Sequence, residues 1–335
     1  DFLIVGGGLA GHILQIQLQE KGCSSIVIDY SKSNASSVVA AGLVNPVAGK
    51  FFTLTWRAEE IFESLATFYS DVENRLNSSF FTPKTLTRIF ATPGEQNIWL
   101  SKAHQDKYKS YCSFKNIEIK GLKSNYGVLE IAKGGELDVS LFLGSCKASY
   151  SNRNEKFDFE KLNVKSKSYD DIKYKNIVFC EGYEVLYNPY FNHLPFVPTK
   201  GELLEIETSL PQSNTVYLGP VFMQPRGGKL WKVGATYAPN IVDKLPTKEK
   251  KDDLIKRLNK IIDVPYNIVN QTAGIRPATE DRRPLIGRHS SNENMYVFNG
   301  FGSKGVSLIP LLAKEFIDFV LNNAPLHPEV NINRF

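Results

Sequence analysis

Cysteine is scarce in this chain of 335 residues, and its pattern argues against two kinds of site. The four cysteines, Cys23, Cys112, Cys146 and Cys180, lie far apart, with neither a CxxC pair nor a cysteine and histidine spacing typical of metal ligands. We therefore expect no metal site and no disulfide framework. Reduced thiols and a cytoplasmic location are the expectation.

The chain also lacks a strong charge of one sign and a long apolar run. Lys and Arg number 40 against 35 Asp and Glu, which gives a net charge of +5. The densest basic stretch, residues 244–260, includes three acids and is typical of a solvated helix, so the charge alone does not argue for nucleic-acid binding. Residues 305–321 contain Lys314, Glu315 and Asp318, so we expect no membrane span there. Glycines interrupt the apolar N-terminal run, so no signal peptide is expected.

The chain does have, near its start, a strand that leads into a glycine turn. Residues 2–5 are apolar, and Gly6, Gly8 and Gly11 form a GxGxxG pattern. Gly6 would let the strand turn tightly, Gly8 would let backbone amides approach a phosphate, and Gly11 would let the next helix pack on the sheet. The helix expected over residues 12–21 would point its free N–H groups at the anion. The pattern predicts a site for the pyrophosphate of a dinucleotide.

A second expected strand, residues 26–28, ends at Asp29. Asp29 stands 23 positions after Gly6, near the spacing at which an acid accepts hydrogen bonds from an adenosine ribose. The alternative is a solvated loop residue. Because the acid follows a strand, a glycine turn, a helix and a strand in that order, we favour the ribose.

The length of the chain and its 42% hydrophobic content predict two domains. Residues 200–207, 215–224 and 229–236 are expected to form an antiparallel sheet, with a hairpin turn at residues 226–228. Such a sheet would suit a substrate domain.

Two other expected strands end in glycine. The strand over residues 173–180 ends at Gly182, and the strand over residues 295–299 runs into a glycine-rich turn and a long helix. A further strand is expected over residues 156–168. Residues 30–50 are rich in Ser, Asn, Ala and Gly and predict a small-residue loop that lies flat against a ligand.

Taken in order, these segments resemble the D-amino acid oxidase family of FAD-dependent oxidoreductases. Several separate motifs match in sequence order, which makes the resemblance much more specific than a lone GxGxxG. The matching segments are GGGLAG at residues 6–11, the loop at 36–46, the strand end at 178–182, residues 198–202 and 234–236, GIRPATED at 274–281 and NGFGSKG at 299–305.

The resemblance implies an α/β fold, with a Rossmann-like FAD-binding domain (a GR2-type flavoprotein) and a second, antiparallel-sheet α+β substrate domain. It implies that the FAD-binding domain comprises residues 1–76, 128–185 and 266–335. The substrate domain would comprise residues 77–127 and 186–265.

The resemblance also implies the residues that bind FAD. The first turn would hold the pyrophosphate, the acid would hold the ribose, and the small-residue loop would lie along the diphosphate and flavin. Sarcosine oxidases attach their flavin through a C-terminal cysteine, but Cys180 is the last cysteine here, so we expect noncovalent FAD. The expected cofactor contacts are Gly6, Gly8, Leu9, Ala10, Gly11, Asp29, Tyr30, Ala41, Gly42, Leu43, Gly182, Gly300, Phe301, Gly302, Ser303, Lys304 and Gly305.

In the family, the final turn touches the flavin ring, and the last helix points its positive end at N1 and the C2 oxygen. Lys304 departs from the glycine or histidine often found there. One interpretation is that Lys304 adds a positive charge beside the flavin, and the other is that it is a helix-start lysine that points to solvent.

The resemblance assigns Arg276 to the substrate carboxylate, in a bidentate pair that suits a planar guanidinium. The alternative is an ion pair with a surface acid such as Asp281. The implied reaction transfers a hydride from the substrate α-carbon to flavin N5, driven by the neutral amine, so we assign no catalytic base. Aromatic residues at strand spacing, Tyr217, Phe222, Trp231 and Tyr237, are attributed to packing and left outside the site.

Three functional classes follow. The first is an FAD oxidase or dehydrogenase that acts on a small-molecule amino acid or carboxylate-bearing secondary amine, with oxygen or another electron acceptor. The second is oxidation of a wobble-uridine side chain in tRNA, as in one branch of the family, which keeps nucleic acid open as a partner. The third is an NAD-dependent dehydrogenase, and the C-terminal motifs argue against it.

Overall fold

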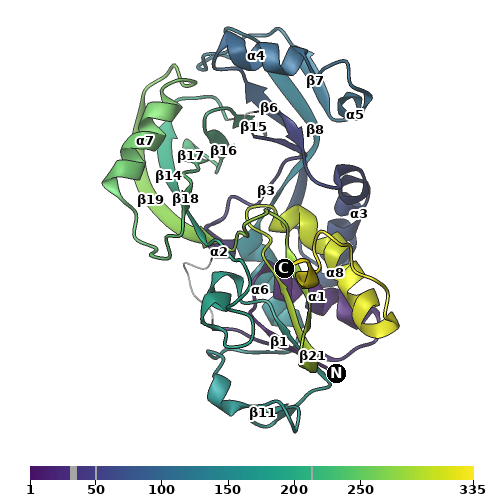
Figure 1. Ribbon diagram of the computed structural model, residues 1–335. Coiled ribbons are helices and arrows are strands. Elements are labelled where there is room, and N and C mark those ends of the chain that lie inside the picture. Colours follow the sequence, from purple (N-terminus) through teal and green to yellow (C-terminus); the bar gives the residue numbers. More distant parts are fainter. Residues whose placement is uncertain (31–35, 50, 213) are drawn as a thin grey trace.

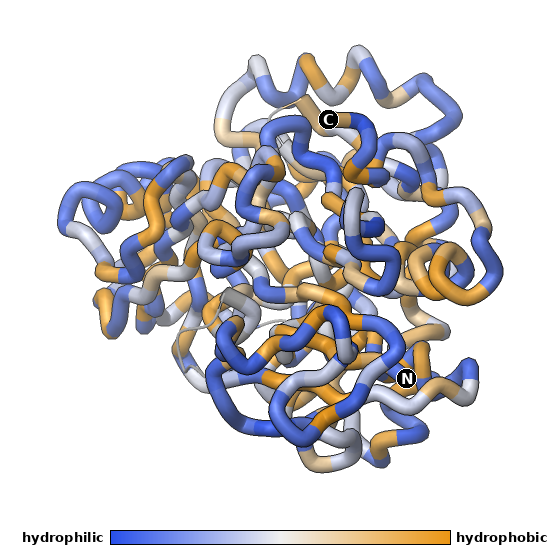
Figure 2. The backbone as a smooth tube through the Cα atoms, turned by 60° about the horizontal axis from the view of Figure 1, so that its bottom comes forward, coloured by the Kyte–Doolittle hydropathy of each residue, from blue (hydrophilic) through white to orange (hydrophobic). Residues whose placement is uncertain are grey.

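The computed structural model describes residues 1–30, 36–49, 51–212 and 214–335. Two sheets form the centres of two parts that lie one above the other in Figure 1. Hydrophobic positions gather along the inner strands of both parts, and hydrophilic positions follow the outer loops (Figure 2). None of the described helices is long and apolar enough to cross a membrane.

A six-stranded sheet forms the lower part in Figure 1, in the order β20, β21, β13, β1, β2, β9. All neighbours are parallel except β20, which is antiparallel to β21. Four of these parallel strands, β21, β13, β1 and β2, therefore end at the same edge of the sheet, where ligands bind in open α/β folds. The bounds are β1 (Phe2–Val5), β2 (Ser25–Ile28), β9 (Asn152–Arg153), β13 (Asn176–Phe179), β20 (Leu285–His289) and β21 (Asn292–Asn299).

Helices pack against this sheet through apolar stripes. Pro310 lies inside the last long helix and has no N–H to donate to the carbonyl of Val306, four residues earlier. The hydroxyl of Tyr69 donates to that carbonyl at 2.8 Å instead and ties two helices together. The helices of this part are α1 (Leu9–Glu20), α2 (Ser36–Val39), α3 (Ala58–Leu76), α6 (Val139–Ser149), η2 (Gly182–Tyr187), α8 (Gly305–Asn322) and η3 (Ile332–Arg334).

A ten-stranded sheet forms the upper part, in the order β18, β14, β17, β16, β15, β6, β8, β3, with β19 on β14 and β7 on β8. Its strands are β3 (Leu43–Val44), β6 (Phe81–Ile89), β7 (Cys112–Lys115), β8 (Val128–Leu137), β14 (Thr199–Thr208), β15 (Val216–Leu218), β16 (Phe222–Pro225), β17 (Leu230–Gly234), β18 (Ala238–Pro239) and β19 (Tyr266–Arg276). It carries α4 (Pro93–Leu100), α5 (Asp106–Lys109) and α7 (Lys248–Leu258), and β4 (Val47–Ala48) pairs with β5 (Thr53–Leu54) in a separate hairpin.

Two expected strands are wrong. Residues 156–168 form a 3-10 turn, η1 (Phe159–Lys161), and the edge of a small sheet of β10 (Leu162–Asn163), β11 (Ser168–Tyr169) and β12 (Ile172–Lys173). Residues 215–224 form two strands, β15 and β16, because the chain reverses at Gly219 and Pro220 between them.

The sheets cross the expected division into domains. β3, β8 and β19 fall in ranges expected for the FAD-binding domain, yet all three pair in the ten-stranded sheet. The division itself stays a prediction, and we propose moving β8 and β19 to the other domain.

Candidate functional site

A cavity of 2240 Å³ opens where the two sheets meet, at the carboxyl edge of the six-stranded sheet. Pockets for drug-sized ligands enclose about 300 to 1,000 Å³, so this cavity has room for a dinucleotide and a second molecule. Its lining includes the expected glycine turn, the end of β2, part of the small-residue loop, the end of β13 and the C-terminal turn.

The first glycine turn has the backbone that its sequence requires. Gly6 has a φ of +105°, and a Cβ on it would lie 2.5 Å from the carbonyl oxygen of Cys180. A Cβ on Gly11 would overlap the carbonyl oxygen of Gly6, so α1 packs against the turn only without a side chain there. Gly8 is the N-cap of α1 and has no side chain to accept from the first N–H groups of the helix, and the N–H of Leu9 donates instead to Oγ of Ser37 at 3.5 Å.

Asp29 and Tyr30 follow β2 and line the cavity beside this turn. The carboxylate of Asp29 lies 3.3 Å from the ammonium group of Lys147, and a Cβ on Gly7 would lie 2.7 Å from the Cβ of Asp29. The ring of Tyr30 is largely exposed. Asp29 is thus held at the cavity wall, and its contact with a ribose stays a prediction.

The small-residue loop crosses from the lower part to the upper sheet. The carbonyl of Ala41 accepts a hydrogen bond from the amide of Gln224 at 2.9 Å, and Gly42 has a φ of +66°. A Cβ on Gly42 would overlap the carbonyl oxygen of Leu137, and Leu43 begins β3. All three loop residues line the cavity, and residues 31–35 and 50 of this expected loop lie outside the described residues.

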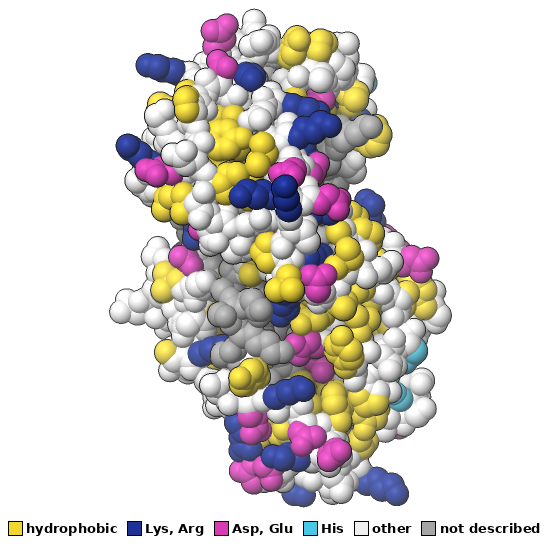
Figure 3. Space-filling view, turned by 90° about the vertical axis from the view of Figure 1, so that its left-hand side faces the viewer, with side chains coloured by type: hydrophobic (Ala, Val, Ile, Leu, Met, Phe, Trp, Pro, Cys, Tyr) yellow, Lys and Arg dark blue, Asp and Glu magenta, His cyan; other side chains and the backbone are white. Residues whose placement is uncertain are grey.

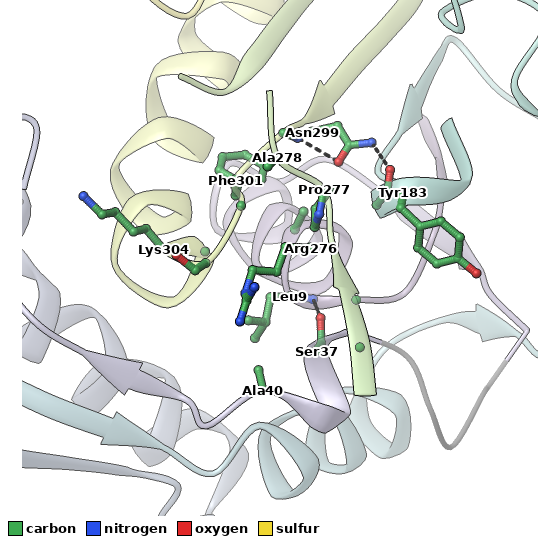
Figure 4. A pocket seen from close by; sticks show the side chains of 18 of the residues that line it. Leu9, Ser37, Ala40, Tyr183, Arg276, Pro277, Ala278, Asn299, Phe301 and Lys304 are labelled. Atoms are coloured by element: carbon green, nitrogen blue, oxygen red, sulfur yellow. Dashed lines mark hydrogen bonds between the residues drawn. The ribbon is translucent and has the colours of Figure 1, made fainter. Parts of the chain in front are cut away.

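The C-terminal turn closes the same cavity from the other side. Gly300 has a φ of +83°, and Gly302 donates its N–H to the carbonyl of Pro277 at 3.0 Å. Asn299, at the end of β21, donates to the carbonyl of Gly182 at 2.9 Å, which joins the end of this strand to the start of η2 (Figure 4). The cavity lining includes all six residues of the turn, Gly300, Phe301, Gly302, Ser303, Lys304 and Gly305.

Lys304 is half-buried at the N-cap of α8. Burial lowers the pKa of Lys304, and the charges of Arg283 and Arg282 lower it further. In Figure 4 its side chain points away from Arg276. The ammonium group of Lys304 is therefore close enough to Arg282 and Arg283 to feel their charges. Its role toward a flavin stays a prediction.

Arg276 is the last residue of β19, and Figure 4 shows its side chain reaching into the cavity. Its Nη1 donates to the carbonyl of Thr236 at 3.3 Å, and burial lowers the pKa of the guanidinium. Among the described residues Arg276 has no ion pair with an acid. The alternative partner, Asp281, lies 2.8 Å from Arg334 instead.

Sequence reasoning missed several residues of the cavity, among them Phe222, Tyr237 and Glu181. Tyr237 is 61% exposed, lines the cavity and acts electrostatically on Arg276, whereas Tyr217 and Trp231 stack at 5.9 Å in the core of the upper part. Strand spacing alone does not distinguish an aromatic residue that lines the cavity from one that packs in the core. Glu181 also lines the cavity, and the strand end at Gly182 could have directed attention to it.

The described residues fit a dinucleotide cofactor. Helices α1 and α8 begin at the cavity, and their N-cap residues, Gly8 and Lys304, make no side-chain hydrogen bond to the first turn. Uncapped N–H groups and the positive dipole ends of two helices attract anionic groups. The described residues contain no cluster of His, Cys, Asp and Glu suited to a metal ion.

The parallel strands and the cavity at their carboxyl edge define a Rossmann-like α/β fold. A model of the family described as FAD dependent oxidoreductase matches residues 152–319. The chain therefore belongs to this family, which is named after D-amino acid oxidase, and its cofactor is FAD.

The chain is similar to proteins with different established activities, tRNA modification in one case and glycine oxidation in another. The chain is 21% identical over 348 residues to the tRNA 5-methylaminomethyl-2-thiouridine biosynthesis bifunctional protein MnmC of Idiomarina loihiensis, across 94% of this chain and 54% of that protein. It is 27% identical over 172 residues to glycine oxidase of Bacillus subtilis, across 49% of this chain and 46% of that protein. The chain thus spans about half the length of the curated relatives it matches.

Solved structures show the same fold. Glycine oxidase from Geobacillus kaustophilus superposes with a TM-score of 0.81 at 18% identity, over 97% of this chain and 95% of that one. Iminodiacetate oxidase from Chelativorans sp. BNC1 superposes with a TM-score of 0.77 at 16% identity, over 98% of both chains.

Proposed function

We propose that this chain oxidises the C–N bond of a small amino acid, or of a secondary amine that carries a carboxylate. The observation that carries the proposal is the guanidinium of Arg276, which has no acidic partner among the described residues and opens on the cavity that both glycine turns line. Burial of an arginine without an acidic partner is costly, and a substrate carboxylate would form a bidentate pair with it.

The residues of the chain bind and orient the substrate in this proposal. Arg276 fixes the carboxylate, so that the α-carbon is held at a constant place in the cavity. FAD, when bound, supplies N5 as the acceptor of a hydride. The electron pair of the neutral amine drives the hydride from the α-carbon, and no residue is assigned as a general base.

Anaerobic reduction of the flavin tests the proposal. Purified protein is mixed without oxygen with glycine, sarcosine and a panel of D-amino acids, and bleaching of the flavin absorbance is followed. We expect at least one carboxylate-bearing amine to bleach it, whereas the matching amines without a carboxylate leave it oxidised. Bleaching by the two sets at equal rates would contradict the assigned role of Arg276. Oxygen uptake with the active substrate then distinguishes an oxidase from a dehydrogenase.

We also propose that FAD is held without a covalent bond. The chain has no cysteine after Cys180, and burial raises the pKa of that thiol well above its usual range. Acid precipitation should leave the flavin in the supernatant. Flavin that stays with the pellet through washing would show a covalent link.

A second candidate is oxidation of a wobble-uridine side chain in tRNA. It is favoured by the match to MnmC over 94% of this chain and by two cavity cations, Arg282 and Lys304, that have no acidic partner among the described residues. On the face drawn in Figure 3, however, basic and acidic side chains are intermixed, with no continuous basic patch. Bleaching by bulk tRNA but by none of the amines would select this candidate.

A further inference from the structure

An acidic residue, Glu181, adjoins the first glycine turn, which we assign to the phosphates of the cofactor. Glu181 follows β13 and lines the cavity. Its Cα would lie 3.1 Å from a Cβ placed on Gly6, so its backbone touches the first glycine of the turn. A carboxylate at this place would repel a pyrophosphate, which carries two negative charges.

One oxygen of Glu181 is held and the other is free. The amide nitrogen of Asn188, a fully buried residue, donates to Oε2 of Glu181 at 2.6 Å. The amide is fixed in this orientation because its own oxygen accepts from the backbone N–H of Tyr190 at 2.8 Å. Oε1 of Glu181 has no hydrogen-bond partner among the described residues.

The surroundings favour the neutral form of this carboxyl. Burial raises the pKa of Glu181 to about 7, the bond from Asn188 opposes the rise, and the charge of Glu184 adds to it. The thiol of Cys180 is the other titratable group that interacts with Glu181. β1 and its glycine turn contain no titratable side chain, and the amide of Asn299, which binds η2 from β21, is uncharged. An anionic cofactor would favour the proton further.

We propose that Glu181 binds FAD as a neutral acid, with its Oε1–H group donating a hydrogen bond to the anionic part of the cofactor. FAD binding then takes up one proton from solvent onto Oε1, and no bond other than O–H forms or breaks. The proposal concerns the cofactor of the family and does not depend on which substrate is oxidised.

Release of FAD from the holoenzyme at different pH values tests it. The protein is diluted at pH values from 6 to 9, and free FAD is measured by its fluorescence. Below pH 7 the dissociation constant should stay level, and above pH 7 it should rise by about tenfold per pH unit, because the proton must then be taken from solvent. A wild-type dissociation constant that is level from pH 6 to 9 would overturn the proposal.

Two substitutions of Glu181 distinguish a proton donor from a residue that only packs, and one substitution of Glu184 tests the neighbouring charge. The amide N–H of Glu181→Gln can donate without the uptake of a proton from solvent, so this variant should bind FAD tightly with a level pH profile. Glu181→Ala has no donor and should bind FAD weakly at every pH. Glu184→Gln removes a neighbouring acid and should keep the rise with pH, shifted to lower pH. If Glu181→Gln weakens binding as much as Glu181→Ala, the assigned hydrogen bond is wrong.

Calorimetry gives a second readout. FAD is titrated into FAD-depleted protein at pH 8 in two buffers of different ionisation enthalpy. Wild type should take up close to one proton per FAD, and Glu181→Gln should take up none. An equal uptake in both proteins would place the proton on another group and refute the proposal.

Discussion

Gly201 lies directly against the guanidinium of Arg276. A Cβ on Gly201 would overlap Cζ and both terminal nitrogens of that group. The contact follows from the antiparallel pairing of β14 and β19, in which Gly201 is opposite Gly274, two residues before Arg276. Because side chains two residues apart on a strand share a face, the arginine folds back over the bare glycine backbone. The absence of a side chain at position 201 therefore makes the space for the group that we assign to the substrate.

Arg276→Ala should weaken the binding of carboxylate ligands by roughly 3 to 5 kcal/mol, the usual cost of removing one partner of a buried ion pair. Arg276→Lys should recover only part of this, because an ammonium group lacks the planar pair of donors. Perturbation of flavin absorbance by a carboxylate ligand measures the affinity. Arg334→Lys, which changes an arginine already paired with Asp281, is the control and should bind normally. Normal binding by Arg276→Ala would remove Arg276 from the site.

Gly201→Ala should displace Arg276 and raise the KM for the substrate while FAD stays bound. The added methyl group meets the guanidinium of Arg276, so we expect the substrate affinity to change and the flavin content to stay the same. Gly94→Ala is the matched control, because a Cβ there would have Thr92 Oγ1 at 3.7 Å as its nearest neighbour. A similar KM for Gly201→Ala and the wild type would show that the guanidinium tolerates displacement.

Asp29→Asn should weaken FAD binding by roughly 1.5 to 3 kcal/mol if the carboxylate accepts ribose hydroxyls, since hydrogen bonds to charged groups are worth about that much. FAD release on dilution measures the change. Asp171→Asn is the control, because Asp171 pairs with Arg153 and is not part of the cavity lining. Equal FAD affinity in Asp29→Asn and wild type would indicate that Asp29 serves only to hold Lys147.

The FAD-depleted protein should lose stability as the pH rises from 4.5 to 7 through Glu181. The folded-state pKa of about 7 exceeds the usual value of 4.5, so the folded protein binds more protons, and the stabilisation is complete below 4.5 and lost through 7. The loss amounts to roughly 3 kcal/mol at 1.36 kcal/mol per pKa unit. Urea unfolding at pH 4.5 and pH 8 measures it, and Glu181→Gln should lack this part of the change. An identical change in both proteins would mean that other groups carry the pH dependence.

The sequence predicts those features of the site that depend on local backbone. A strand, a glycine turn and a helix follow one another within residues 2–20, so their order alone indicates a dinucleotide fold. The same holds for residues 295–305 at the other end. The family and its cofactor followed from these segments and are confirmed by the family match.

Features that depend on distant contacts were not predictable. The space over Gly201 exists because of a pairing between strands about 75 residues apart, and the raised pKa of Glu181 results mainly from the burial of that side chain in the folded chain. An apolar run such as residues 215–224 also does not reveal where the chain reverses, and this is why one strand was expected in place of two.

The order of the strands in the six-stranded sheet has a consequence for synthesis on the ribosome. The cavity edge needs β1 from the start of the chain and β21 with the turn that ends at Gly305. A nascent chain that has not yet emerged past residue 305 lacks one wall of the FAD site. The complete FAD site therefore forms only after this turn has emerged, and until β21 is present the apolar strand β13 lacks its neighbour on one side.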